Sequence, residues 1–143
     1  MAQQAKFSIN VKPRARDQFL GTGIVYMSVL MDYSLEGGNA YLEKLGLVQP
    51  PGLVLVPLRH EITYHSPLLM SEEAKVSART TRLGRSSAAS EYQINEAKTE
   101  RPIANILLNS VLIDIETGRS VPIPDEWRQK IIAFEGKENV EVA

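Results

Sequence analysis

The sequence predicts an α+β fold in which a curled antiparallel sheet of about five strands wraps around one long central helix. Two observations support this prediction. Residues 23–45 read as a helix whose first half is apolar on nearly every side, which is typical of a buried helix. Later in the chain, four segments alternate between apolar and polar residues with no second long helix between them. The chain has 143 residues, and we expect one domain, 1–143.

Composition narrows the class of protein. The net charge of −1 argues against a nucleic-acid surface, and the absence of cysteine excludes disulfides, thiolate metal sites and cysteine nucleophiles. We find no cluster with metal-ligand spacing. Residues 1–20 lack the apolar run of a signal peptide, and charged residues interrupt the long helix before it could span a bilayer. We expect a cytoplasmic protein with no membrane partner.

The first two elements are a short strand and the long helix. Residues 5–11 alternate between apolar and polar side chains, which predicts a half-buried strand. We expect the helix to extend over Gly23–Leu45 with Thr22 as its N-cap. The Gly37-Gly38 pair in its middle indicates either close packing or a kink.

Four strands in meander order and a short helix complete the predicted fold. In the first strand the even-numbered residues are expected to form the apolar face throughout, and the last strand is apolar on both faces, as a central strand should be. A polar, frayed tail is expected from about residue 136. The strands are expected at residues 54–65, 73–82, 87–95 and 103–115, and the helix at about 125–134.

The long helix also predicts a partner subunit. It is apolar nearly all round, and one sheet can cover only about half of it. A second copy of the chain is the simplest source of the remaining cover. We therefore expect a homodimer, which could pair again into a tetramer.

Six stretches between residues 16 and 128 carry a resemblance to a known family. In order and spacing they resemble the 4-hydroxybenzoyl-CoA thioesterase type of acyl-CoA thioesterase, which has the hot-dog fold. The resemblance covers about residues 5–133. The stretches are Arg16-Asp17, GIVY (23–26), YLEKLGL (41–47), ITYHSPLL (62–69), TRLGRSS (81–87) and ETGRSVPIPDEWR (116–128).

The resemblance implies hydrolysis of an acyl-CoA without any cofactor beyond the CoA of substrate and product. In that family a carboxylate before the helix attacks the thioester or activates water, and amides at the helix start polarise the carbonyl. Other hot-dog thioesterases use a glutamate on the helix itself. The implied residues are Asp17, with Glu36 and Asp32 as alternatives, for catalysis; Gly23, Val25, Tyr26 and Met27 for the amides; Met31 and Tyr33 for the acyl pocket; and Arg82, Arg85 and Ser86 for the phosphates of CoA.

The chain departs from the family pattern at one important position. Alignment on Gly23 places Leu20 where the family has its catalytic aspartate, and Asp17 lies three residues earlier. Two functions therefore stay open: an acyl-CoA thioesterase, and a non-catalytic hot-dog dimer that binds an acyl-CoA or another ligand without hydrolysis. A dehydratase is a weaker third alternative, because it would need a histidine facing a carboxylate and only His60 and His65 are available.

Overall fold

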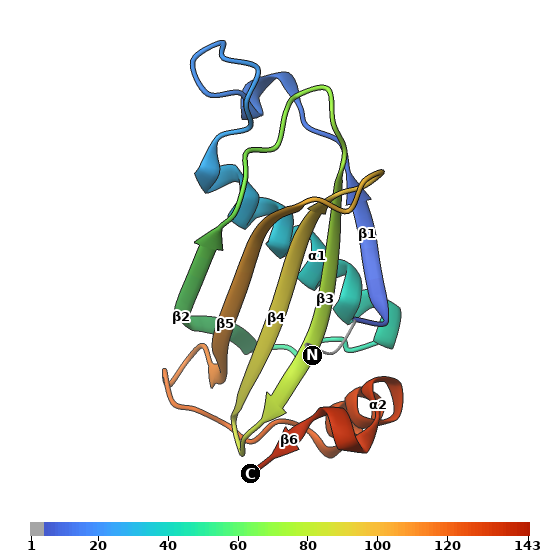
Figure 1. The fold of residues 1–143 in the computed structure, drawn as a ribbon. Helices are drawn as coiled ribbons and strands as arrows, with labels where there is room; N and C mark the ends of the chain where they lie inside the picture. The colour runs from blue at the N-terminus through green and yellow to red at the C-terminus, as the bar shows by residue number, and fades with distance from the viewer. Residues whose placement is uncertain (1–4) are drawn as a thin grey trace.

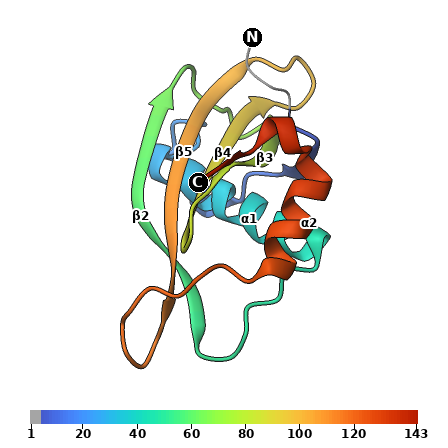
Figure 2. The ribbon, with the colours of Figure 1, turned by 90° about the horizontal axis from the view of Figure 1, so that it is seen from below.

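A curled sheet wraps around one long helix, as Figures 1 and 2 show for the computed structural model, which describes residues 5–143. Across the sheet the order of the long strands is β1-β3-β4-β5-β2, and each neighbouring pair is antiparallel. The predicted fold class is therefore confirmed. The strands are β1 (Phe7–Val11), β2 (Leu53–Tyr64), β3 (Ala74–Leu83), β4 (Ser87–Glu96) and β5 (Pro102–Asp114), and the helices are α1 (Met27–Leu45) and α2 (Asp125–Glu135).

Strand β2 lies at the sheet edge beside β5, not beside β3. The predicted meander is correct for β3, β4 and β5 but wrong for β2, because alternation of side chains reveals a strand without revealing its neighbour. The loop at residues 65–73 leads from the end of β2 to β3, passing close to the segment before α1 (Figure 1). Within the described residues, β2 pairs only with β5, so its outer edge is free.

A bulge in β2 reverses the predicted faces of its first half. The register with β5 shifts between Pro57 and Arg59, which leaves Leu58 as the extra residue. Leu55 before the bulge and Ile62 after it both pack against the core, although one is odd-numbered and the other even-numbered. The prediction that all even-numbered residues share the apolar face is therefore wrong before Leu58, because a bulge adds one residue to one strand.

Helix α1 begins at Met27, four residues after the predicted start at Gly23. Its N-cap is Tyr26 rather than Thr22. The intervening residues are not helical, because Gly23 has a φ of 79° and residues 24 and 25 form isolated bridges with other segments. The predicted end at Leu45 is confirmed.

The two glycines in α1 allow the helix to lie directly on the sheet. A Cβ on Gly37 would lie 2.8 Å from Cγ1 of Val76 on β3, and one on Gly38 would lie 2.8 Å from the hydroxyl of Tyr92 on β4. Such distances are shorter than normal van der Waals contacts, so the backbone can approach only where a side chain is missing. Of the two predicted roles, close packing is the one the structure supports.

The chain after α2 is ordered, contrary to the predicted frayed tail. A single 3-10 turn, η2 (Lys137–Asn139), leads into β6 (Glu141–Val142), which pairs in parallel with the end of β3. Val140 is buried in the same cluster as Leu83 and Ile131. One apolar residue in a polar segment therefore anchors the C-terminus.

Candidate functional site

Two of the predicted carboxylates meet in one polar cluster beside α1. The 3-10 turn η1 (Ala15–Asp17) brings Asp17 against the helix, where Oδ2 of Asp17 accepts hydrogen bonds from the Tyr33 hydroxyl at 2.6 Å and the Arg14 amide at 2.9 Å. The Arg14 guanidinium then donates to Oε1 of Glu36 at 2.6 Å. Arg14 thus connects Asp17 to Glu36.

Asp17 is almost fully buried, with 4% of its surface exposed. Burial alone would raise the pKa of Asp17, but the hydrogen bonds from Tyr33 and Arg14 and the nearby arginine charges more than offset it and hold the pKa below its usual range. The pKa of Tyr33 is raised, first by burial and then by the adjacent Asp17 carboxylate. Asp17 is therefore ionised at neutral pH, is a weak base and has little access to a substrate.

Glu36 and Asp32 are the two predicted catalytic carboxylates on α1, and both are accessible to solvent. The Glu36 side chain is about two-fifths exposed even while it contacts Arg14, and Asp32 is exposed on the solvent side of the helix. Glu36 also lines an open groove between α1 and β1, together with Arg14 and Asn39. Of the three predicted carboxylates, Glu36 combines a charged partner with access from solvent.

Most of the amides predicted to polarise a carbonyl are already engaged. The Gly23 amide donates to the Gln18 side chain, the Val25 amide to the Leu68 carbonyl, and the Tyr26 amide to the Asp17 carbonyl. The prediction that these three amides are free is wrong, because residues 23–26 belong to a bonded loop rather than to the helix. In the described part of the chain, the first-turn amides of Met27 and Ser28 donate to no protein acceptor, as expected at a helix start.

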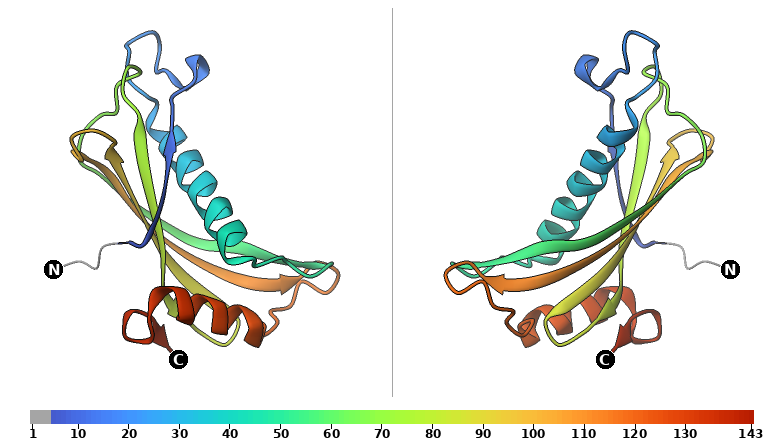
Figure 3. Two further views of the ribbon diagram at one scale, coloured as in Figure 1. Left: turned by 90° about the vertical axis from the view of Figure 1, so that its right-hand side faces the viewer. Right: turned by 90° about the vertical axis from the view of Figure 1, so that its left-hand side faces the viewer.

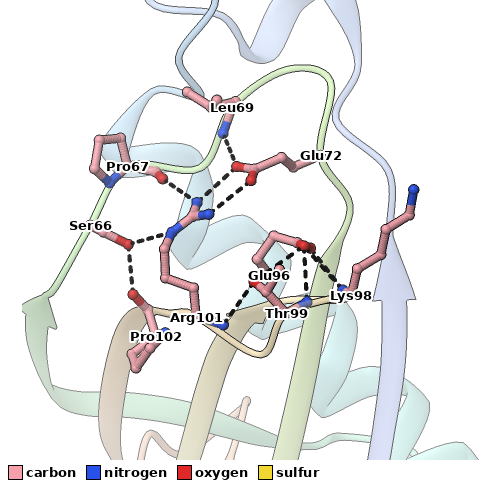
Figure 4. Close-up of polar contacts among 9 residues, drawn as sticks. All are labelled: Ser66, Pro67, Leu69, Glu72, Glu96, Lys98, Thr99, Arg101 and Pro102. Carbon is pink, nitrogen blue, oxygen red and sulfur yellow. Dashed lines mark hydrogen bonds and ion pairs between the residues drawn. The ribbon is translucent and has the colours of Figure 1, made fainter.

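A second loop supports this helix start. In the loop at residues 65–73, the Leu68 carbonyl accepts a hydrogen bond from the Val25 amide, and the Met70 amide donates one to the Gly23 carbonyl at 2.9 Å. Figure 4 shows how the loop itself is held: the guanidinium of Arg101 forms two parallel bonds to Glu72, at 2.8 and 2.9 Å, and also contacts Ser66 and Pro67. This Glu72–Arg101 clamp, which no sequence pattern predicted, fixes the loop on which the segment before α1 depends.

The two residues predicted to form an acyl pocket do not line the cavity that the structure contains. Tyr33 has no exposed surface and its hydroxyl is bonded to Asp17, so its predicted place in an open pocket is wrong. A cavity of about 220 Å³ lies instead along the second half of α1, and neither Met31 nor Tyr33 lines it. Its walls come from α1, the inner face of the sheet and α2.

The residues predicted to contact CoA lie at the end of the molecule opposite Asp17. Arg82 lies near the end of β3 and Arg85 lies in the turn between β3 and β4. Figures 1 and 3 show this turn at the far end of the sheet from the loop before α1. Both arginines are exposed, and the Ser86 carbonyl accepts the Leu112 amide. One chain therefore does not bring Asp17 and these residues into one site.

One further buried cluster escaped the sequence analysis. Glu135, at the end of α2, is buried and its Oε2 accepts hydrogen bonds from the Tyr41 hydroxyl at 2.6 Å and from the Thr80 amide at 3.1 Å. Burial, followed by the bond to Glu135, raises the pKa of Tyr41. The helical pattern of α2 marked only its apolar side, so nothing in the sequence distinguished Glu135 from a solvated residue.

The described residues 5–143 contain neither a group of metal ligands nor a membrane-spanning helix. No three His, Asp or Glu side chains are grouped there so that they could hold a metal ion, and no helix among them has the length and apolar character needed to cross a membrane.

Several solved structures share this architecture, and thioesterases are among them. A thioesterase from Thermus thermophilus, complexed with coenzyme A and zinc, is 29% identical, with a TM-score of 0.76 over 90% of this chain and 94% of that one. A 1,4-dihydroxy-2-naphthoyl-CoA thioesterase from Synechocystis is 18% identical, with a TM-score of 0.80 over 87% and 94%. A protein from Pseudomonas aeruginosa is 20% identical, with a TM-score of 0.83 over 92% of each chain.

The search of curated proteins found no match to this chain. The scan of family models gave a direct result: the model of the thioesterase-like superfamily matches residues 15–131, which include β3, β4, β5, α1 and the Arg14-linked turn η1. With the hot-dog architecture already established from the sheet and α1, this match identifies the chain as a member of the thioesterase-like superfamily.

Proposed function

We propose that this protein hydrolyses an acyl-CoA to a carboxylic acid and free CoA. The observation that carries this proposal, beside the family membership, is the pairing of an accessible carboxylate, Glu36, with a long helix whose first amides are free. Hydrolysis of a thioester needs a base for the attacking water and donors for the developing oxyanion. The known thioesterase structure with bound coenzyme A supports CoA as the thiol part.

In this proposal Glu36 acts as the general base. It takes a proton from water as the water oxygen bonds to the carbonyl carbon, and the amides of Met27 and Ser28 hold the oxyanion. Collapse of the tetrahedral intermediate breaks the C–S bond, and the CoA thiolate leaves and takes up a proton. Asp17 holds Arg14 and Tyr33 in place and is a positioning residue in this scheme.

The proposed site requires two copies of the chain. Glu36 lies nine positions after Met27, or about 13 Å along the helix axis, which is too far for both to contact one thioester. In a two-fold dimer with antiparallel helices, the start of one α1 would lie beside Glu36 of the other. The exposed Met27 and Leu35 on α1 and the free edge of β2 support such a dimer.

The same dimer explains the separated CoA residues. Arg82 and Arg85 lie at the opposite end of the chain from Asp17, and a two-fold axis across α1 would bring the β3–β4 turn of one copy toward the helix start of the other. Arginine side chains there suit the phosphates of CoA. We propose a homodimer with two equivalent sites, each built from both chains.

Thiol release from a panel of acyl-CoA esters tests the proposal directly, because the chain has no cysteine to react with the thiol reagent. We expect Glu36→Gln to lower kcat by at least about a hundredfold. Asp32→Asn is the matched control on the same helix and should retain activity. Retained turnover in Glu36→Gln would refute the assignment of the base.

Complementation tests whether each site is shared between chains. Met27→Pro removes one donor while keeping the helix, because proline is tolerated at the first helical position and Tyr26 is already extended. If sites are shared, mixing inactive Met27→Pro with inactive Glu36→Gln restores about a quarter of wild-type activity, since half the dimers then hold one intact site. If each site lies within one chain, the mixture stays inactive.

A second candidate function is binding of an acyl-CoA without hydrolysis. The observation that favours it is at position 20, where the family's catalytic aspartate is replaced by a leucine that is 85% exposed. Calorimetry with hexanoyl-CoA distinguishes the two functions, because a binder releases heat of binding but no thiol. Thiol release that Glu36→Gln abolishes would exclude this alternative.

A further inference from the structure

The cavity beside the second half of α1 is an apolar space that the fold leaves unfilled. Its volume is about 220 Å³, and it is bounded by α1, by the inner faces of β2, β3, β4 and β5, and by α2. Figure 3 shows α2 at this end of the molecule, opposite the loop before α1. Apolar side chains dominate its walls, among them Leu42, Leu47, Leu55, Leu83, Trp127 and Ile131.

The cavity exists because small residues face it from the sheet. Ala88 and Ser90 of β4 and Ser110 of β5 have small side chains at the cavity. Farther along the same strand faces, the larger side chains of Tyr92 on β4 and Leu112 on β5 fill the interior. Protein interiors are normally packed without gaps of this size, and a dry cavity of about 150 Å³ already admits benzene. A gap of 220 Å³ is therefore large enough for a ligand group.

Two of the polar side chains that line the cavity, Thr80 and Tyr41, are bonded within the protein. The hydroxyl of Thr80 donates to Tyr41 at 3.0 Å, and the hydroxyl of Tyr41 donates to the buried Glu135. Because these hydroxyl protons are already bonded within the protein, the ligand group that enters gains most from apolar contact.

The cavity meets the proposed reaction site at Asn39. This residue lines both the cavity and the neighbouring groove that contains Glu36 and Arg14. Leu35, one residue before Glu36, lies at the rim and is partly exposed. A thioester lying across Asn39 can therefore place its acyl group in the cavity while its carbonyl stays beside Glu36.

We propose that this cavity binds the acyl group of the substrate and limits it to about one ring or a short chain. The proposal rests on the thioesterase function proposed above. The volume of the cavity is about one and a half times that of a cavity that binds benzene. It therefore admits an acyl group such as hexanoyl and excludes a long chain such as palmitoyl. The substrate class is thus a short-chain or single-ring acyl-CoA.

Filling the cavity from β4 tests the proposal. Ala88→Leu should lower kcat/KM for hexanoyl-CoA at least about tenfold, the usual effect of removing space for apolar groups, and leave acetyl-CoA within about twofold. Ala89→Leu is the matched control, because Ala89 follows Ala88 on the strand and lines a pocket on the opposite face. Equal effects of Ala88→Leu on both esters, or no effect on either, would overturn the proposal. Ser110→Leu provides a second filling variant if Ala88→Leu does not fold.

A binding experiment separates failure of this proposal from failure of the proposed function. Trp127 lines the cavity and is the only tryptophan of the chain, so its fluorescence reports occupancy. We expect saturable quenching by 6-bromohexanol in the wild type and in Ala89→Leu, and its loss in Ala88→Leu. Absence of thiol release from every ester refutes the proposed function alone, whereas absence of saturable quenching in the wild type refutes the cavity.

Discussion

Replacing Glu72 with glutamine tests whether the Glu72–Arg101 clamp stabilises the loop that supports the start of α1. The Glu72 carboxylate accepts hydrogen bonds from the Arg101 guanidinium and from the Leu69 amide. The bonds from Arg101 are the largest cause of the lowered pKa of Glu72, which is about 2 instead of 4.5. A carboxyl group with a lowered pKa stabilises the fold above its ordinary pKa. This stabilisation is complete above about pH 4.5 and is lost as the pH falls toward 2.

The size of the effect follows from the same pKa. Because the pKa of Glu72 falls from 4.5 to about 2, Glu72 can contribute at most about 3 kcal/mol to the free energy of unfolding. The Arg101 side chain is 37% exposed, so solvent screens the pair and the realistic contribution is about 1–2 kcal/mol. Glu72→Gln should lower the free energy of unfolding by that amount at pH 7.

Urea unfolding of the wild type and Glu72→Gln at several pH values provides the measurement. The two proteins should differ by about 1–2 kcal/mol at pH 7 and converge as the pH approaches 2. Glu61→Gln is the control, because Glu61 lies 4.0 Å from Arg59 with both side chains largely exposed, and it should change stability little. A difference between wild type and Glu72→Gln that is independent of pH would refute the reasoning.

Two further predictions concern packing and a buried hydroxyl. Gly37→Ala should lower the free energy of unfolding by about 1–3 kcal/mol, because the new methyl group would clash with the stiff Val76 side chain. Gly38→Ala should lower it less, because its methyl group meets only the movable end of the Tyr92 side chain. Thermal unfolding of the two variants provides the comparison. Tyr41→Phe removes the hydroxyl that donates to the buried Glu135 and should cost about 1–3 kcal/mol by urea unfolding, while Tyr64→Phe at an exposed position should be neutral.

Local patterns predicted the long strands and the two helices of this fold, but not the contacts between them. The alternation that predicted β3 and β4 is confirmed in the structure, where Val76 and Ile94 lie on the buried faces, because each face of a strand repeats every second residue. The same rule failed in the first half of β2, because the bulge at Leu58 moved the odd-numbered residues to the buried face. No glycine at this point of the sequence indicated a bulge. The neighbours of β2 depend on the path of the loop after it, which no periodicity records.

The candidate site was harder to predict, because its chemistry depends on which polar groups are already bonded. Val25 and Tyr26 lie near the helix start as expected, yet their amides are consumed by the carbonyls of Leu68 and Asp17. The resemblance implied Asp17 as a catalytic carboxylate, whereas the structure shows it buried and bonded to Tyr33 and Arg14. Such pairings are tertiary, and a single sequence does not contain them.

These hydrogen-bond pairings also bear on the homodimer proposed above. Asp17 and the amides of residues 23–26 are bonded within the loop before α1, whereas the amides of Met27 and Ser28 have no acceptor among the described residues and Glu36 is partly exposed. Because the helix rise separates Glu36 from the amides of Met27 and Ser28 by about 13 Å, the proposed mechanism brings them together across antiparallel copies of α1. If hydrolysis occurs, dimerisation is then a condition for assembling the site, and dilution below the dimer dissociation constant should abolish turnover before it unfolds the chain.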